Sequence, residues 1–269
     1  MATSVPLEDL GCITLADLAG ICKLMGLEYL PYPFFTRAWL PQTPEHADSI
    51  VPRFAHGDLS VFRHWIHSYA NADIWLECQV HYVAADVAAT RIMACRANQF
   101  GYVASQRPDD DVVDVFAVSP LEIGPAVIAA AGPVTPGAHD RIVAPPCFVD
   151  LRRDDNRATD EGDGGYEFSL VPVAPQRRAA TVVSRSDVEM MAVVQSHCTP
   201  ARAWGLTRDN RAVCWVGVTG DGHYAYTDDF THATPATEQV LSGRVNRLLA
   251  EDVRTLRQRR PPGEAVREL

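Results

Sequence analysis

Alternation of side chains from Ile74 onward is the feature that most restricts the fold of this chain. One face of the segment 74–82 is apolar, which predicts a half-buried β-strand. Its members are Ile74, Leu76, Cys78, Val80 and Tyr82, with Trp75, Glu77, Gln79 and His81 on the other face. Further strands are predicted at Val87–Arg96, Phe100–Ser105 and Val112–Val118. The breaks between them are too short for crossover helices, so the strands must form an antiparallel meander.

Two amphipathic helices are predicted before the meander. The first begins at Thr14 and ends at Gly26, with apolar residues at spacings of three and four. The second is predicted to use Asp58 as its N-cap and to end near Asn71. Its buried face is Leu59, Phe62, Trp65, Ile66 and Tyr69. Prolines alternate with aromatic residues over 27–44, which predicts an ordered loop on the core, and little helix signal precedes Asp58.

The remainder of the chain after the first meander carries further helix and strand signals. Ser119 to Glu122 has the form of a capping box and predicts a helix toward Ala131. A charged, glycine-containing stretch at 149–178 predicts a flexible loop. A second capping box at 186–189 before an apolar run predicts another helix. Strands at 201–207, 211–218 and 223–228 and a terminal helix begun by Thr234-Pro235 are then expected.

Each half therefore runs from a helix through an antiparallel meander to a helix begun by a hydroxyl residue and proline. No repeat of individual residues is visible. Two such halves could pair into one sheet with helices at each end. We expect one domain over 1–269, divided into a first half (1–148), a charged loop (149–180), a second half (181–260) and a tail (261–269).

Composition excludes several classes of protein. The 269 residues carry 24 basic and 34 acidic side chains, a net charge of -10, which disfavours general attraction to nucleic acid or anionic lipid. The N-terminal 25 residues lack the charge order of a secretory signal, and the longest uncharged run, Ile123–Ala138, contains three prolines. We expect a cytoplasmic protein without stable membrane insertion. The seven cysteines form no CxxC pair and are expected to be buried thiols.

Residues with catalytic or metal-binding chemistry are scattered. The candidates are Glu45, His46 and Asp48, then His56 and Asp58, and then His64 and His67. His64 and His67 are three residues apart on a helix, a spacing that permits metal binding, but no carboxylate or cysteine accompanies them at matching spacing. His223 follows Gly220-Asp221-Gly222, which a hairpin turn explains. No phosphate-binding, metalloprotease or nucleophile-elbow motif occurs, so we expect no catalytic site, no metal and no cofactor.

The terminal helix is rich in arginine. Residues 239–260 hold six arginines against Glu251 and Asp252, so six minus two gives +4 in a chain of -10. Such a stripe suits an acidic partner or nucleic acid, or is a solvated helix face. The absence of interleaved aromatic residues weakens the case for nucleic acid.

Four stretches resemble the EspG family of type VII (ESX) secretion. The first is the opening helix with its turn at Gly26, Pro31 and Tyr32. The second is the tryptophan-bearing helix at 64–66 followed by the strand 73–77, Asp-Ile-Trp-Leu-Glu. The third is the series of strands over 90–118, in which Val-Ala-Ser-Gln-Arg at 103–107 stands between a turn and an acidic turn, and the fourth is the glycine-turn hairpin at 211–228 before a long terminal helix.

This resemblance implies an α+β fold, with a central antiparallel sheet made of two pseudo-twofold-related halves and flanked by helical bundles. It also implies a non-enzymatic cytoplasmic chaperone in mycobacteria that binds the apolar tip of a PPE protein in a PE–PPE heterodimer, keeps it soluble and targets it to secretion. Such a protein needs an exposed apolar surface with a polar rim. We expect that surface on the solvent side of the second meander, at Trp215, Tyr224, Tyr226 and Phe230.

Two alternatives of other classes stay open at this point. One is a small-molecule enzyme that uses the aromatic and histidine-rich region from Tyr29 to His67. The other is a nucleic-acid-associated protein that uses the terminal arginines. The oligomeric state and the identity of the PE–PPE pair do not follow from the sequence.

Overall fold

The computed structural model describes residues 5–27, 29–36, 44–84, 86–144, 180–198 and 211–259. Its strands are β1 (Glu8–Thr14), β2 (Ile74–Tyr82), β3 (Thr90–Ala97), β4 (Phe100–Gln106), β5 (Val112–Val118), β6 (Ile142–Val143), β7 (Thr181–Val182), β8 (Val188–His197), β9 (Ala212–Val218), β10 (Gly222–Tyr226) and β11 (Ala233–Pro235). Its helices are α1 (Leu15–Leu24), α2 (Pro44–His56), α3 (Arg63–Ala70), α4 (Ile123–Ala130) and α5 (Glu238–Arg259), with 3-10 turns η1 (Asp58–Phe62) and η4 (Arg185–Asp187). The predicted strand at 201–207, the predicted tail 261–269 and nearly all of the predicted charged loop lie outside the described residues.

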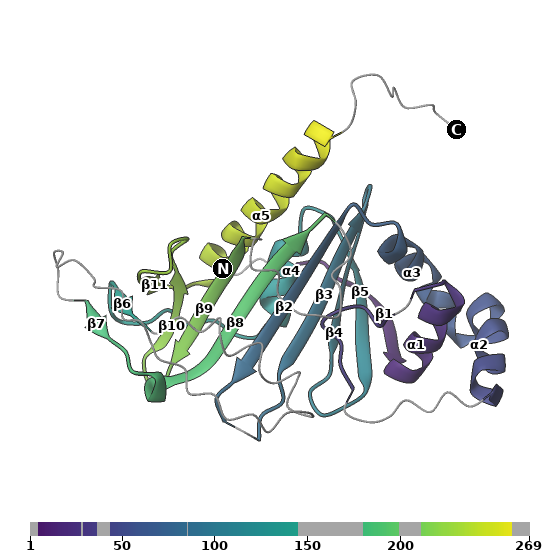
Figure 1. Ribbon diagram of the computed structural model, residues 1–269, viewed down its shortest axis with the longest axis horizontal. Coiled ribbons are helices and arrows are strands. Elements are labelled where there is room, and N and C mark those ends of the chain that lie inside the picture. Colours follow the sequence, from purple (N-terminus) through teal and green to yellow (C-terminus); the bar gives the residue numbers. More distant parts are fainter. Residues whose placement is uncertain are drawn as a thin grey trace, which may run out of the picture.

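All of these strands form one sheet, in the order β1-β5-β4-β3-β2-β8-β9-β10-β11-β6-β7 (Figure 1). The described pairings are antiparallel except for β6 with β7. The meander β2–β5 and the series β8–β11 run outward in opposite directions from the central β2–β8 pair, and each is followed by a helix, α4 or α5. This mirrored order confirms the predicted α+β sheet of two related halves.

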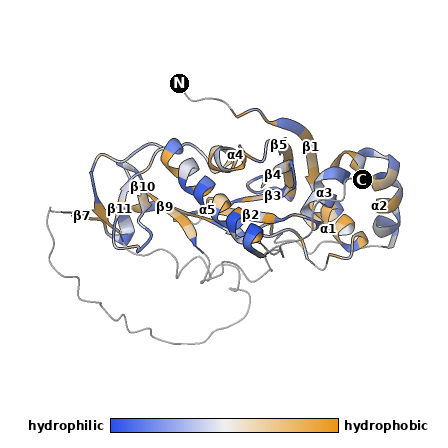
Figure 2. Ribbon diagram, turned by 90° about the horizontal axis from the view of Figure 1, so that it is seen from above, coloured by the Kyte–Doolittle hydropathy of each residue, from blue (hydrophilic) through white to orange (hydrophobic). Residues whose placement is uncertain are grey.

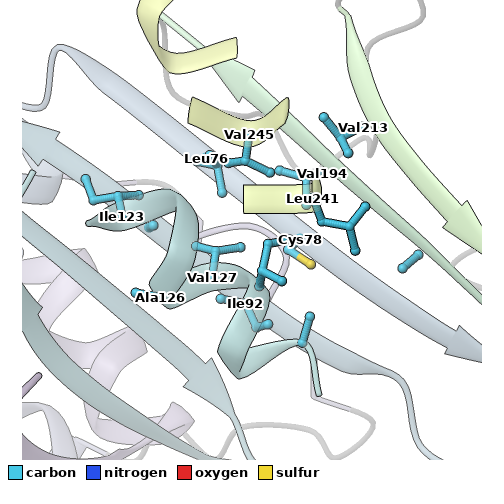
Figure 3. Packing of buried hydrophobic residues seen from close by; sticks show 14 of the residues in the cluster. Leu76, Cys78, Ile92, Ile123, Ala126, Val127, Val194, Val213, Leu241 and Val245 are labelled. Carbon is cyan, nitrogen blue, oxygen red and sulfur yellow. The ribbon is translucent and has the colours of Figure 1, made fainter. Parts of the chain in front are cut away.

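Helices α4 and α5 contact each other across one face of the sheet and share its largest core. Ile123 and Val127 of α4 meet Leu241 and Val245 of α5 above the strand residue Leu76, and all are at most 1% exposed (Figure 3). Because the core takes side chains from β2, β3, β8 and β9, burial in it binds the two halves together. The sequence predicts one apolar face for this helix, and the structure confirms it, since its members enter the core or pack against it: Leu241, Val245, Leu248, Leu249, Val253 and Leu256.

The opposite face of the first half is covered by α1, α2 and α3, which gather at one end of the molecule (Figure 1). Trp65 and Ile66 of α3 and Leu18 of α1 are completely buried there. Thr14 caps α1 by accepting a hydrogen bond from the Asp17 backbone N–H, as the sequence predicts. The prediction that β2 is half-buried is wrong, because Glu77 and Gln79 on its second face are 2% and 3% exposed.

The helix predicted from the capping box at 186–189 is wrong. Ser184 and Asp187 do form a capping box, but it serves only the short turn η4, and the chain then extends as β8. Met190, Ala192 and Val194 face the α4–α5 core, which is the two-residue period of a strand. Pairing with β2 and β9 on both sides therefore outweighs the local helix signal.

Three local predictions about helix ends also differ from the structure. Asp58 caps no helix, because its carboxylate binds Arg53, and η1 begins after Gly57. Helix α4 begins at Ile123 without the predicted capping box, and α5 is preceded by β11 where Thr234-Pro235 was expected to begin a helix. Helix α2, which carries Pro52 internally, was not predicted at all. Its one clear sequence signal is Pro44 at the first helical position.

Candidate partner-binding surface

Three of the four aromatic residues predicted to bind a partner are buried. Trp215, Tyr224 and Tyr226 are 1%, 0% and 4% exposed, and only Phe230 is half-buried. Trp215 belongs to the α4–α5 core, whereas Tyr224 and Tyr226 pack in a separate cluster on the other face of β9 and β10. The expectation of a solvent-facing surface is therefore wrong for Trp215, Tyr224 and Tyr226, because both faces of these interior strands are covered.

A strap formed by residues 133–144 fixes the Tyr224 hydroxyl. Tyr224 donates to Asp221 Oδ2 at 2.5 Å and accepts from the His139 backbone N–H at 3.0 Å. Asp221 Oδ1 accepts from the Ala138 backbone N–H at 2.7 Å, and these hydrogen bonds hold the pKa of Asp221 below its ordinary value. The glycine turn before His223 is confirmed as the β9–β10 hairpin, with positive φ at Gly220 and Gly222. These hydrogen bonds attach the strap to the β9–β10 hairpin, so the region has a structural role.

The most exposed apolar chain segment beside the central pair is the loop between β2 and β3. Tyr82 ends β2 at 37% exposure, and Val83 and Val87 in the loop are 53% and 47% exposed. The loop has few polar side chains, since alanines and the exposed Asp86 make up most of its remainder. We call Tyr82, Val83 and Val87 the hairpin-tip patch. Sequence reasoning missed it, although two Val-Ala-Ala runs at a strand break mark an unusually apolar turn.

The hairpin-tip patch is attached to an ordered base. The Val83 backbone N–H donates to Glu189 of β8 at 2.9 Å, and the Val87 N–H donates to Ala84 at 3.2 Å. On the following strand, the Arg91 guanidinium lies 5.2 Å from the centre of the half-exposed Phe35 ring and donates to the Pro33 carbonyl. A cation over an aromatic ring adds a polar contact at the margin of an apolar surface. Arg91 pairs with Gln79 in the β2–β3 register, so this cation lies on the strands that carry the hairpin tip.

The catalytic and metal candidates do not converge on one centre. His64 and His67 both lie exposed on α3, and Asp58 pairs with Arg53 at 2.8 Å. Nε2 of His46 lies 3.7 Å from Asp17, whose carboxylate also binds Arg53 at 2.8 Å. Within the described residues, Glu45, Asp48 and His56 belong to no cluster of potential metal ligands. Over the described ranges, no three His, Cys, Asp or Glu side chains are close enough together to hold a metal ion.

The buried polar pair at the central seam was not singled out from the sequence. Nε2 of His197 on β8 lies 3.2 Å from Oε1 of Glu77 on β2, with exposures of 6% and 2% for the two side chains. This contact is an ion pair only when His197 is protonated and Glu77 is ionised, and no described group hydrogen-bonds to either Glu77 carboxylate oxygen. Burial raises the pKa of Glu77, and His197 partly opposes that shift.

Comparison with known proteins defines the class of this protein. The model of the EspG family matches residues 14–247, so the chain belongs to the EspG family. It also resembles the solved structure of the type VII secretion system chaperone EspG5 of Mycobacterium tuberculosis in complex with a PE25–PPE41 dimer. That match has 11% identity and a TM-score of 0.47, over 94% of this chain and 98% of that one. No curated protein matches. None of the described helices is long and apolar enough to cross a bilayer.

Proposed function

We propose that this EspG-family protein is a non-enzymatic cytoplasmic chaperone of type VII secretion. Its partner is a PE–PPE heterodimer, bound through the apolar tip of the PPE protein, which it keeps soluble and targets to the secretion machinery. Membership of the EspG family supports this proposal, and the hairpin-tip patch is the structural observation that carries it. Exposed apolar side chains at a strand end are costly to leave in water and suit an apolar partner.

The hairpin tip replaces the aromatic set as the main proposed contact. Its three side chains are accessible, whereas Trp215, Tyr224 and Tyr226 are buried. Of the original four residues, Phe230 keeps accessible surface, and its ring lies 5.9 Å from that of Tyr226. We keep Phe230 as a secondary contact and assign the other three to the support of the sheet.

Co-expression tests both the partner and the surface. The protein is produced with the PE–PPE pair encoded in the same gene cluster, and the mixture is separated by size-exclusion chromatography. We expect the three chains to elute together. Val83→Asp with Val87→Asp should abolish co-elution, because burying two carboxylates at the contact costs several kcal/mol, on the order of 2 or more each.

Leu121→Asp is the matched control. Leu121 is 82% exposed and lies between β5 and α4, away from the hairpin tip along the chain, so this variant should bind like the wild type. Separate elution of the wild-type protein from every cognate pair contradicts the proposed function. Unchanged binding by the hairpin-tip variant contradicts only the proposed surface.

A further inference from the structure

A row of exposed arginines runs along α5 on the side away from the sheet. Arg247, Arg254 and Arg257 are all exposed, and their spacing places them on one face of the helix over about 15 Å. The small residues Gly243 and Ala250 share that face and are also exposed. Hydrophilic segments recur along α5 in Figure 2. We call the three residues the arginine row.

The two carboxylates near the arginine row already have partners. Glu251 pairs with Arg211, just before β9, at 2.6 Å, and Asp252 accepts a hydrogen bond from Ser196 of β8 at 2.5 Å. Arg244 also has a partner, because its guanidinium donates a hydrogen bond to the Tyr226 carbonyl. Within the described part of the chain, no ion pair or hydrogen bond is formed by the side chains of the arginine row. The row therefore presents three unneutralised positive charges.

The arginine row and the hairpin-tip patch lie at opposite ends of β8. Asp252 of α5 contacts Ser196 near the end of β8, whereas the β2–β3 loop is attached to Glu189 near its beginning. Seven residues of strand separate these anchor points by about 23 Å. Figure 1 shows α5 running out past the strand ends, away from the hairpin. A partner on the row can therefore bind while the hairpin tip is occupied.

The helix alone does not explain the row. Interaction with the helix dipole favours a cation only in the last turn, and Arg247 lies three turns before the helix end at Arg259. Nucleic acid fits poorly, because residues 1–150 hold 17 acidic and 8 basic side chains, or -9, which repel a long polyanion. A second copy of this chain would place its own acidic half against the row, in a reciprocal twofold dimer, a ring or a filament, and size-exclusion chromatography of the chain alone would detect that association. An acidic surface on another protein fits the row.

We propose that the arginine row is a second docking surface, which binds an acidic, carboxylate-rich segment of a protein other than the one bound at the hairpin tip. Arginine suits this role because its planar guanidinium takes a carboxylate through two parallel hydrogen bonds. Because the row is exposed, salt screens its charge pairs, and binding of the acidic segment should weaken as the salt concentration rises. This inference rests on the α5 geometry, and it stands whether or not the hairpin tip binds a PPE protein.

The probe is a fluorescein-labelled 15-residue helical peptide with glutamate at every third or fourth position. Fluorescence anisotropy with the full chain at 25 mM NaCl should show saturable binding that weakens at least tenfold at 200 mM NaCl. Arg247→Glu with Arg254→Glu should weaken it at least tenfold. Arg63→Glu with Arg141→Glu makes the same change in net charge at exposed positions on α3 and before β6, and should weaken it less than twofold.

Three results overturn the proposal. The first is no binding of the peptide, and the second is equal weakening by the two double variants. The third is tighter binding to a labelled 20-base-pair DNA duplex than to the peptide, lost in Arg247→Glu with Arg254→Glu, which assigns the row to nucleic acid. Co-elution with a PE–PPE pair is measured separately on the same α5 variant and should be unchanged, so failure of the proposed function is distinguishable from failure of this inference.

Discussion

The two halves of the sheet share a plan but build their second faces differently. Each contributes an ordered series of strands outward from the β2–β8 seam and one helix to the common α4–α5 core. On the other face the first half adds three helices, α1 to α3. The described cover of the second half includes the 133–144 strap and β6, where Ile142 and Ala144 are buried beside Tyr224. The shared α4–α5 core joins the two halves in one fold, whereas the layers on the opposite face of the sheet differ between them.

Charge is also distributed unevenly along the chain. Residues 1–150 carry -9 and residues 151–269 carry 16 basic and 17 acidic side chains, or -1. In the first half, some of the acidic side chains form internal ion pairs, such as Asp73 with Arg96 at 2.7 Å. The second half leaves arginines exposed on α5. The halves therefore differ most in what they present to other molecules, while they agree in how they fold.

The largest predicted effect tests whether the halves unfold as one unit. Trp65 in the α1–α3 layer and Trp215 in the α4–α5 core are fully buried tryptophans of the first and second half. Replacing either one with alanine should cost about 3–5 kcal/mol through lost burial and the cavity left behind. Urea unfolding followed by far-UV circular dichroism should show one transition, at lower urea, in both variants.

A second transition in Trp65→Ala alone would show that the α1–α3 layer unfolds separately from the sheet. Trp215→Phe, which keeps most of the buried ring, serves as the milder control and should lose less stability than Trp215→Ala. A Trp215→Ala protein that keeps its full stability contradicts the placement of this side chain in the core.

A smaller effect should be confined to the first half. Arg53 on α2 bridges Asp17 of α1, at 2.8 and 3.0 Å, and Asp58 of η1, and its removal leaves the nearly buried Asp17 without its main cation. Arg53→Ala should destabilise the protein by about 1–3 kcal/mol, mostly through Asp17. Amide hydrogen exchange should speed up in α1 and α2 while β8 and β9 keep their protection.

Arg63→Ala is the control, since this exposed arginine makes only a 3.3 Å contact with the Ser60 carbonyl. It should leave the exchange rates of α1 and α2 unchanged. Equal loss of protection throughout the sheet in Arg53→Ala would show that the helical layer and the meander are a single cooperative unit.

The strands with strict alternation were predictable from the sequence, and the elements fixed by tertiary context were not. β2 to β5 follow their apolar period closely, because one face must be buried whatever covers the other. β8 was predicted as a helix because residues 186–189 have the form of a capping box and an apolar run follows them, whereas the capping box in the structure is formed by Ser184 and Asp187. A strand that is apolar on both faces loses the alternation that reveals it, whereas β2 keeps its alternation through the polar Glu77 and Gln79 although both of its faces are buried.

The candidate surface was harder to predict for the same physical reason. Aromatic residues in a strand signal burial as readily as binding, and the structure buries Trp215, Tyr224 and Tyr226. The hairpin tip consists of small aliphatic residues, which sequence reasoning assigns to a strand end. The arginine excess of the last helix was visible from composition, but the structure was needed to show that Glu251 and Asp252 are paired with Arg211 and Ser196.

The smallest predicted effect lies at the seam between the halves and depends on pH. Burial raises the pKa of Glu77 above its ordinary value of 4.5, so the folded protein holds a proton that the unfolded chain has lost between those two values. The stabilisation that Glu77 contributes is therefore present below pH 4.5, and it is lost as the pH rises from there through the raised pKa of the folded protein. Glu77→Gln removes this dependence and should be more stable than the wild type at pH 8, by on the order of 1 kcal/mol.

Urea midpoints of the two proteins, measured from pH 4.5 to 8, should therefore converge at the acidic end and separate as pH rises. Gln195→Leu, which changes a neighbouring buried side chain that does not titrate, should keep the wild-type slope with pH. The opposite sign, with Glu77→Gln less stable at pH 8, would show that the pair with His197 outweighs the cost of burying the carboxylate. In that case β2 and β8 are held together by charge as well as by the apolar core, and the two halves are joined more firmly than the packing alone requires.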